Sequence, residues 1–304
     1  MVDTTPPAEV SIEHHFADVN RVRLHYASAG HGKLVLFLHG FPEFWYAWQR
    51  QLLEFGRDHW AVAPDLRGYN LSSKPDELKE YRLGRLLEDV RGLAEHLGHE
   101  TFVLVGHDWG GLIAWIFAAK YPQYVAKLVI ANAPHPAVFE RELRDSPQQQ
   151  YASSYFGLFA RPDAEAVLTA NNFAFLARAT LDEGFRLGYR VEEDRQKYLN
   201  SWSQPGAITA AINYYRANRL RVPSMGDGFW SIQDSIPELT STVISVPTLV
   251  LWGLKDWALP PGNLDGLQQF VPKLRLRTFA DTGHWVIAAK SNEVNRLIRE
   301  FLRE

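Results

Sequence analysis

The sequence predicts an α/β fold, in which helices cover both faces of a mostly parallel sheet and a helical segment interrupts the sheet. Short, continuous apolar runs that are typical of buried strands alternate with helical segments along the chain. This alternation stops after residue 136 and resumes near Pro247. We therefore expect one core domain made of residues 1–136 and 238–304, with residues 137–237 inserted as a helical cap, or lid.

Apolar runs and helical periodicity locate the elements of the predicted core. The runs predicted as strands are 22–26, 34–38, 60–63, 102–105, 127–131, 247–253 and 274–279. Helices are predicted over 44–55, over 83–97 with Gly98 as its stop signal, after the strand at 102–105, and over 294–302. The prolines in residues 1–10 predict a mobile arm. His14 and His15 follow shortly after, and we expect them to belong to this arm and to be solvated.

Composition excludes several classes of partner and site. The net charge is −3 and no basic run occurs, so nucleic acid and anionic membranes are not expected partners. The chain contains no cysteine and hence no disulfide or thiolate metal site. No stretch approaches the roughly 20 apolar residues of a membrane span, and the first residues lack the pattern of a signal peptide. We expect a cytoplasmic protein; its oligomeric state is left open, with a homodimer among the alternatives.

The stretch from Thr101 to Pro122 organises the rest of the chain. An apolar strand runs into a tight G-x-D-x-G corner and then into a helix rich in alanine, isoleucine and tryptophan. This is the setting of the nucleophile elbow, G-x-S-x-G, with Asp108 in the place of the serine. A carboxylate is already a nucleophile at neutral pH and forms an ester when it attacks carbon. The chain must then also supply a base that activates water and an oxyanion hole.

Two later strand ends supply the candidates for that base and its orienting acid. Asp256 follows the strand at 247–253, and His284 follows the last predicted strand. A single polar residue after a strand is usually a capping residue, but the order nucleophile, acid, histidine is the one that this type of fold uses. The sequence therefore predicts a triad of Asp108, Asp256 and His284 at one edge of the sheet.

An oxyanion hole requires two N–H groups that are directed at the developing negative oxygen. The residue after the nucleophile, Trp109, is one expected donor. The other is Phe41, in the His-Gly-Phe-Pro run that follows the strand at 34–38, since Pro42 has no N–H to donate. By itself this run would be read as a plain turn.

These motifs together resemble a known family. The segments that carry the resemblance are HGFPEFWYAW (39–48), PDLRGYNLSSKP (64–75), GHDWGG (106–111), WGLKD (252–256) and TGHW (282–285). They are similar to the epoxide hydrolase branch of the α/β-hydrolase superfamily, over nearly the whole chain. An aspartate nucleophile also occurs in dehalogenases, so the predicted cap must distinguish the two.

The resemblance implies that two tyrosines of the cap donate hydrogen bonds to the epoxide oxygen. One lies in a motif like N-[WY]-Y-R, which matches residues 213–216 and assigns Tyr215, with Tyr214 at the aromatic position. The other precedes a proline in the first half of the cap, where Tyr155 fits; Tyr151, four residues earlier, remains an alternative. A phenol with a pKa near 10 stays protonated at neutral pH, as a donor must.

The resemblance further implies the reaction, in which an apolar epoxide and water give a vicinal diol through an ester on Asp108. It implies no cofactor, and the chain shows no metal-ligand cluster. Substrate contacts are expected from Phe41, Trp109, Tyr155, Tyr215 and Trp285. The aromatic residues Trp45, Trp109, Phe156 and Trp285 suggest a fairly bulky substrate.

Other functions remain as alternatives with less support. A haloalkane dehalogenase would use the same triad, and Trp109 would suit a halide; Phe41, however, stands where such enzymes typically carry asparagine. A dehalogenase acting on a carboxylate needs an arginine that 109–119 lacks. Asp108 excludes a serine esterase. A ligand receptor of this fold would not need a water-activating pair.

Overall fold

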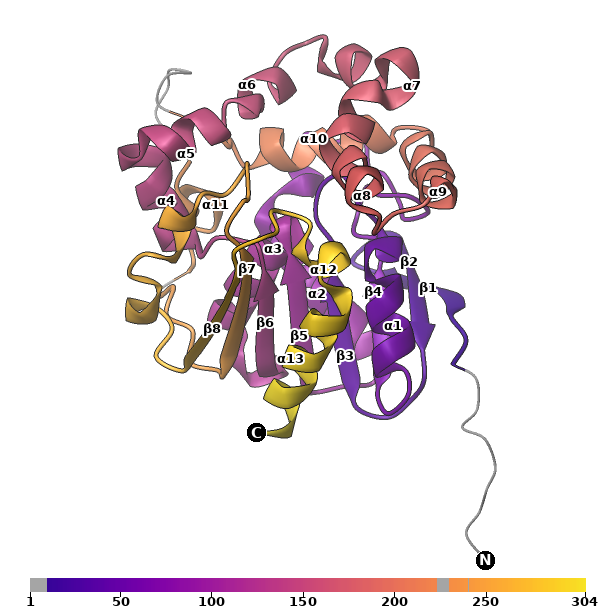
Figure 1. Ribbon diagram of the computed structural model, residues 1–304, viewed down its shortest axis with the longest axis vertical. Helices are drawn as coiled ribbons and strands as arrows, with labels where there is room; N and C mark the ends of the chain where they lie inside the picture. Colours follow the sequence, from indigo (N-terminus) through magenta and orange to yellow (C-terminus); the bar gives the residue numbers. More distant parts are fainter. Residues whose placement is uncertain (1–9, 223–229, 240) are drawn as a thin grey trace, which may run out of the picture.

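The core of the protein is a single eight-stranded sheet (Figure 1). The structure, a computed structural model, describes residues 10–222, 230–239 and 241–304. The strand order is β1-β2-β4-β3-β5-β6-β7-β8; β2 pairs antiparallel with β1 and β4, and all other pairs are parallel. The strands are β1 (Glu13–Val19), β2 (Val22–Ala29), β3 (Leu34–Leu38), β4 (Trp60–Pro64), β5 (Phe102–His107), β6 (Val125–Ala131), β7 (Thr248–Gly253) and β8 (Leu274–Phe279). The predicted α/β fold is confirmed.

Helices pack on both faces of this sheet, which explains why the central strands are continuous apolar runs. Every residue of β3 is buried. Its Val35 and Phe37 side chains pack in the same cluster as α1 and α13, whereas Leu36 and Leu38 face the cluster that contains α2 and α3. The helices are α1 (Gln49–Phe55), α2 (Leu83–His96), α3 (Asp108–Lys120), α4 (Pro136–Asp145), α5 (Pro147–Ala152), α6 (Tyr155–Phe159), α7 (Ala164–Thr180), α8 (Asp182–Leu187), α9 (Glu192–Trp202), α10 (Ala207–Ala217), α11 (Ile232–Ser235), α12 (Val286–Ala289) and α13 (Ser291–Arg303).

The described chain between β6 and β7 consists of helices and the loops that connect them. Helices α4 to α11 follow one another there, and no strand occurs in the described parts of 132–247. Figure 1 shows α6 to α10 beyond one end of the sheet. Tyr155 of α6 and Tyr215 of α10 line a cavity with Asp108, which directly follows the last residue of β5. These helices therefore lie at the carboxyl end of the parallel strands.

Two local expectations were wrong. Residues 13–19 form the edge strand β1, so His14 and His15 are part of the sheet rather than of a mobile arm. The sequence signal was weak because only Ala17 and Val19 of this strand are buried. Residues 1–9 of the predicted arm lie outside the described residues.

The second correction concerns the segment 44–55, which was predicted as one helix. It is a 3₁₀ turn over Trp45–Trp48 followed by α1. Trp45 packs edge-on against His14, at 4.9 Å between ring centroids, rather than contributing to a substrate cavity as its aromatic character suggested.

Candidate active site

Asp108 lies at a sharp corner between β5 and α3. Its φ of 51° places a non-glycine residue in the left-handed region, which is uncommon and marks a strained turn. The flanking glycines allow the corner because the backbones approach closely: a Cβ on Gly106 would lie 2.4 Å from the Gly110 carbonyl oxygen, and one on Gly110 would lie 2.2 Å from that of Leu38. Close backbone contacts therefore explain why the predicted elbow has glycine at both Gly106 and Gly110.

The loop after β3 reaches the Asp108 carboxylate. The Phe41 N–H donates a hydrogen bond to Oδ1 of Asp108 at 2.7 Å. Trp109 is in the first turn of α3, where backbone N–H groups have no acceptor within the helix. The two predicted oxyanion donors therefore flank the same carboxylate, one in direct contact and one at the helix N-terminus beside it.

His284 lies between Asp108 and Asp256. Its Nδ1 is 2.8 Å from Oδ2 of Asp256, and its Nε2 is 3.8 Å from Oδ2 of Asp108. Asp256 is fixed in turn: its Oδ1 accepts from the N–H groups of Ala258 at 2.8 Å and Leu259 at 2.9 Å. Since an ionised carboxylate only accepts, Nδ1 of His284 carries a proton and Nε2 faces Asp108.

The charges around His284 raise its pKa to about 9. Burial alone would lower the pKa, but the charge and hydrogen bond of Asp256 outweigh it, and the charges of Asp108 and Glu43 act in the same direction. With Asp108 ionised, the imidazole is therefore protonated at neutral pH. A neutral Asp108 would remove one of these charges and favour the basic form.

Both predicted tyrosines lie opposite Asp108. Tyr155 and Tyr215 line the same cavities as Asp108, and their ring centroids are 6.0 Å apart. Burial, together with the nearby charge of Asp108, raises the pKa of both phenols, so both stay protonated. Tyr151, by contrast, is 84% exposed. The geometry favours Tyr155 over Tyr151 as the first of the pair.

A cavity of about 70 Å³ opens in front of the triad, and a smaller one of about 30 Å³ adjoins it. Asp108, Tyr155 and Tyr215 line both cavities and therefore lie where the two cavities meet. The walls of the larger one are otherwise mostly aromatic and aliphatic, and include Phe41, Pro42, Phe159, Phe175, Leu176, Ala179, Trp257, Ala258 and Trp285. The smaller one is lined by Trp109, Leu112, Pro134, Phe139, Phe156, Leu220 and Leu259 as well. Four of the five predicted substrate contacts line the larger cavity and the fifth, Trp109, lines the smaller.

Glu43, which sequence reasoning missed, connects helices between β6 and β7 to His284 through His107. One of its oxygens lies 2.9 Å from the Tyr198 hydroxyl and 3.3 Å from Arg190, both from the inserted segment. The other lies 3.3 Å from Nδ1 of His107, whose Nε2 donates to the His284 carbonyl at 2.9 Å. Burial would raise the pKa of Glu43, but His107 and Arg190 lower it to about 2. His107 thus connects Glu43 to the backbone of His284.

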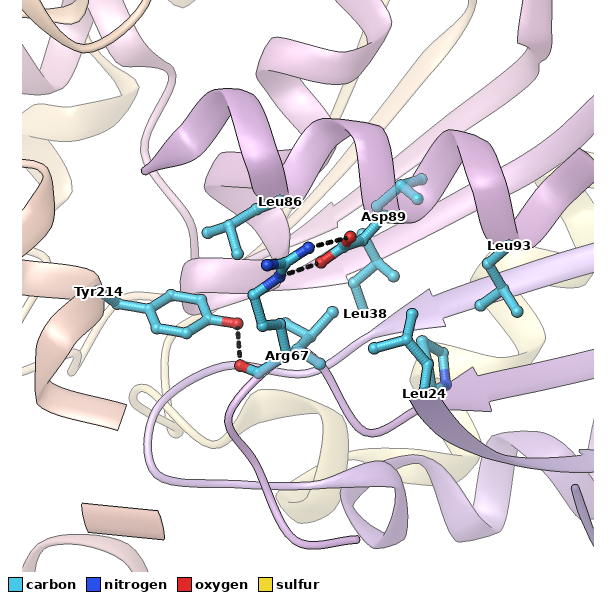
Figure 2. Close-up of a pocket in the computed structure, with 10 residues that line it drawn as sticks. Leu24, Leu38, Arg67, Leu86, Asp89, Leu93 and Tyr214 are labelled. Atoms are coloured by element: carbon cyan, nitrogen blue, oxygen red, sulfur yellow. Dashed lines mark hydrogen bonds and ion pairs between the residues drawn. The ribbon is translucent and has the colours of Figure 1, made fainter. Parts of the chain in front are cut away.

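Helix α10, which carries Tyr215, is fixed to the core by its neighbour Tyr214. Figure 2 shows the Tyr214 hydroxyl donating to the Arg67 carbonyl, at 2.7 Å, and the Arg67 guanidinium paired with Asp89. Both contacts of that pair are 2.7 Å, and both side chains are buried. A planar, bidentate pair of this kind restrains the loop at Arg67, and hence the register of α10.

Asn132 is a second residue that sequence reasoning missed. It follows β6, and its amide donates to Oδ2 of Asp256 at 2.7 Å while its Oδ1 accepts from the Gly253 N–H at 2.8 Å. The available signal was its position directly after a strand with a buried end, similar to the position of Asp256 after β7. Within residues 10–222, 230–239 and 241–304, no three histidine or acidic side chains are grouped to hold a metal ion. None of the helices described there could span a membrane.

Comparison with known proteins places the chain in a family. Residues 33–290 match the model of the alpha/beta hydrolase fold family. The chain is 36% identical to mouse Epoxide hydrolase 4 over 93% of its own length and 77% of that protein, and 37% identical to the AB hydrolase superfamily protein YfhM of Bacillus subtilis over 95% and 97%. The crystal structure of an epoxide hydrolase from Bacillus megaterium in complex with an inhibitor superimposes with a TM-score of 0.89, at 39% identity, over 95% of this chain and 100% of that one. The chain therefore belongs to the epoxide hydrolase family of the α/β-hydrolase superfamily.

Proposed function

We propose that this protein is an epoxide hydrolase that converts an apolar epoxide into a vicinal diol through an ester on Asp108. The observation that supports this most is the pair of phenols, Tyr155 and Tyr215, that lines the same two cavities as the Asp108 carboxylate. Ring opening leaves negative charge on the epoxide oxygen and therefore needs proton donors, whereas a departing halide does not. The names of the relatives at 36% and 39% identity support the same activity.

The proposed first step follows from how the two oxygens of Asp108 differ. Oδ1 is held by the Phe41 N–H, whereas Oδ2 accepts no hydrogen bond from the described residues and lies 3.8 Å from Nε2 of His284. Oδ2 would attack a ring carbon and break its bond to the epoxide oxygen. Tyr155 and Tyr215 would both donate hydrogen bonds to that oxygen, and one of them would transfer its proton to it and become a tyrosinate. Oδ1 would become the ester carbonyl oxygen, already beside the donor that must later stabilise its negative charge.

The proposed second step uses His284. Its Nε2 is too far from Asp108 for a direct hydrogen bond, and the gap of 3.8 Å suits a water molecule near the ester. His284, oriented by Asp256, would take a proton from that water as it attacks the ester carbonyl carbon. The tetrahedral oxyanion would be held by the N–H groups of Phe41 and Trp109. Its collapse would expel the diol oxygen and restore the carboxylate. The two protons of the consumed water, one of them taken up by His284, would go to that oxygen and to the tyrosinate. No cofactor or metal takes part.

In this proposal residues 137–237 act as a cap over the core formed by 1–136 and 238–304. The support is chemical: the inserted segment supplies both tyrosines and part of the cavity wall, while the core supplies the nucleophile, base and oxyanion donors. Epoxide and water must then meet between the two. The aromatic walls favour an apolar substrate.

The first test is to incubate the protein with styrene oxide and, separately, with 1,2-dibromoethane. We expect diol without bromide. In ¹⁸O-labelled water, a single turnover should give unlabelled diol and labelled Asp108, because the first oxygen transferred comes from the carboxylate. Bromide without diol would instead establish the haloalkane dehalogenase alternative, in which Trp109 binds the halide.

Removing either phenol should slow ring opening more than binding. We expect Tyr155→Phe and Tyr215→Phe each to lower kcat about 10²-fold, and the double variant by more, because general-acid assistance contributes about 10²–10⁴-fold. Pre-steady-state ester formation measures this step directly. Tyr151→Phe is the matched control, since that exposed phenol should have no effect. Normal ester formation by the double variant would remove the tyrosines from the mechanism.

A further inference from the structure

The larger cavity reaches the surface of the protein at two aromatic side chains. Phe175 of α7 is 42% exposed, Trp257 in the loop after β7 is 52% exposed, and both line this cavity. The other described residues of its lining are buried or only partly exposed. This opening is the entrance of the cavity, and an apolar epoxide would pass these two side chains on its way to Asp108.

The second half of α7 forms one side of the entrance. Phe175, Leu176, Ala179 and Thr180 all line the cavity, and positions i, i+1, i+4 and i+5 share one face of a helix. Phe175 is the only exposed residue of the four. It is therefore the residue of this helix face at which the cavity meets the surface.

A left-handed turn sets the direction of this half of the helix. Asn171, Asn172 and Phe173 have φ values of 50°, 55° and 62°, so α7 consists of two helical pieces joined by a break. Asparagine tolerates this backbone conformation better than most residues that carry a side chain, whereas β-branched residues rarely adopt it. The two asparagines therefore suit the break.

Contacts with other elements hold the second half of α7 at both of its ends. At the start, the Phe173 ring packs against Trp202, at 6.0 Å between ring centroids, and the Trp202 indole donates to the Pro42 carbonyl at 2.7 Å. At the end, the Trp285 indole donates to the Ala179 carbonyl at 3.1 Å. The helical piece between these attachments, with its exposed phenylalanine, is therefore restrained beside the cavity.

We propose that Phe175 is a specificity-determining residue that narrows the entrance and so favours epoxides with slender substituents over branched ones. This inference rests on the proposed function. The ring occupies volume that a branched substituent would need, and the restrained helix limits how far the ring can move aside. Asn172 is then a positioning residue, which acts through Phe175 by maintaining the left-handed turn.

The test compares two substrates that differ only in width. Styrene oxide is the narrow one, and para-tert-butylstyrene oxide carries a branched group on the same ring. We expect Phe175→Ala to raise the ratio of kcat/KM for the branched over the narrow substrate by about tenfold, and to leave ester formation from styrene oxide unchanged. Leu187→Ala is the matched control and should keep the ratio, because it removes a comparably exposed apolar side chain of α8 that lines neither cavity.

Variants of the turn test how Phe175 is held. Asn172→Val disfavours the left-handed conformation and should raise the same ratio, whereas Asn172→Gly permits that conformation and should not. Adding Asn172→Val to Phe175→Ala should raise the ratio no further, since both changes act through one ring. An effect of Asn172→Val that persists in full without the ring would overturn its positioning role.

The outcomes separate this inference from the function on which it rests. If the wild-type protein forms diol from styrene oxide but Phe175→Ala leaves the ratio unchanged, or changes kcat/KM for both substrates equally, the entrance role of Phe175 is wrong and the epoxide hydrolase activity stands. If neither the wild-type protein nor Phe175→Ala forms diol from either substrate, the proposed function fails and the inference fails with it.

Discussion

Asp108→Asn is expected to abolish diol formation, with a loss in kcat/KM of at least about 10⁴-fold. The amide is a poor nucleophile, so no ester can form. Its oxygen can still accept the hydrogen bond that the Phe41 N–H gives to Asp108 at 2.7 Å, so the corner between β5 and α3 should keep its geometry. Loss of activity would then reflect chemistry rather than unfolding. Steady-state kinetics with styrene oxide, together with a thermal melt, measures both.

Asp281→Asn is a suitable control for that experiment. It makes the same change in a carboxylate three residues from His284, but Asp281 is exposed and pairs with Lys290. The Asp281→Asn variant should form diol at the wild-type rate. Substantial diol formation by folded Asp108→Asn would remove Asp108 as nucleophile. A wild type that binds epoxide without turnover, with the same affinity in the variant, would instead indicate a receptor.

The sequence was sufficient for the parts of the site that local patterns determine. Asp108, Asp256 and His284 each come after a strand of the sheet, and parallel strands bring such positions to one edge. The elbow pattern and the order of the three residues were then enough to predict them as a triad. The close approach of Gly110 to β3 shows why the elbow pattern is so restrictive, since few other residues fit there.

Contacts between distant segments could not be predicted in the same way. Glu43 is part of a recognisable motif, but its partners Arg190 and Tyr198 come from the inserted helices, 147 and 155 residues away. Strand β1 was missed because an edge strand buries few side chains and so leaves a weak signal.

The electrostatics of the site would allow one histidine to serve the proposed two-step reaction. Asp256 and Asp108 raise the pKa of His284 to about 9, so His284 would be an imidazolium beside Asp108 before the epoxide reacts. Ester formation would neutralise Asp108, and loss of that neighbouring charge lowers the pKa of His284. The base would thus become available in the intermediate that needs it. Ester hydrolysis in the wild type should rise with pH, with a midpoint below 9.

His284→Gln should therefore separate the two steps by leaving the first intact and stopping the second. Glutamine can still donate to Asp256 but cannot accept a proton from water, so ester hydrolysis should slow by about 10²–10⁴-fold. We expect a burst of one epoxide consumed per enzyme molecule. The mass of the intact protein should increase by that of a whole epoxide, since ring opening expels no leaving group.

Peptide mapping of that adduct would identify the nucleophile directly, because the added mass must lie on the peptide that contains Asp108. His31→Gln, at an exposed position, is the matched control and should turn over without accumulating an adduct. An adduct on another residue would relocate the nucleophile. Continued turnover by folded His284→Gln would show that water is activated elsewhere, and Glu43 and His107, the nearest buried titratable pair behind the histidine, would then be the groups to replace.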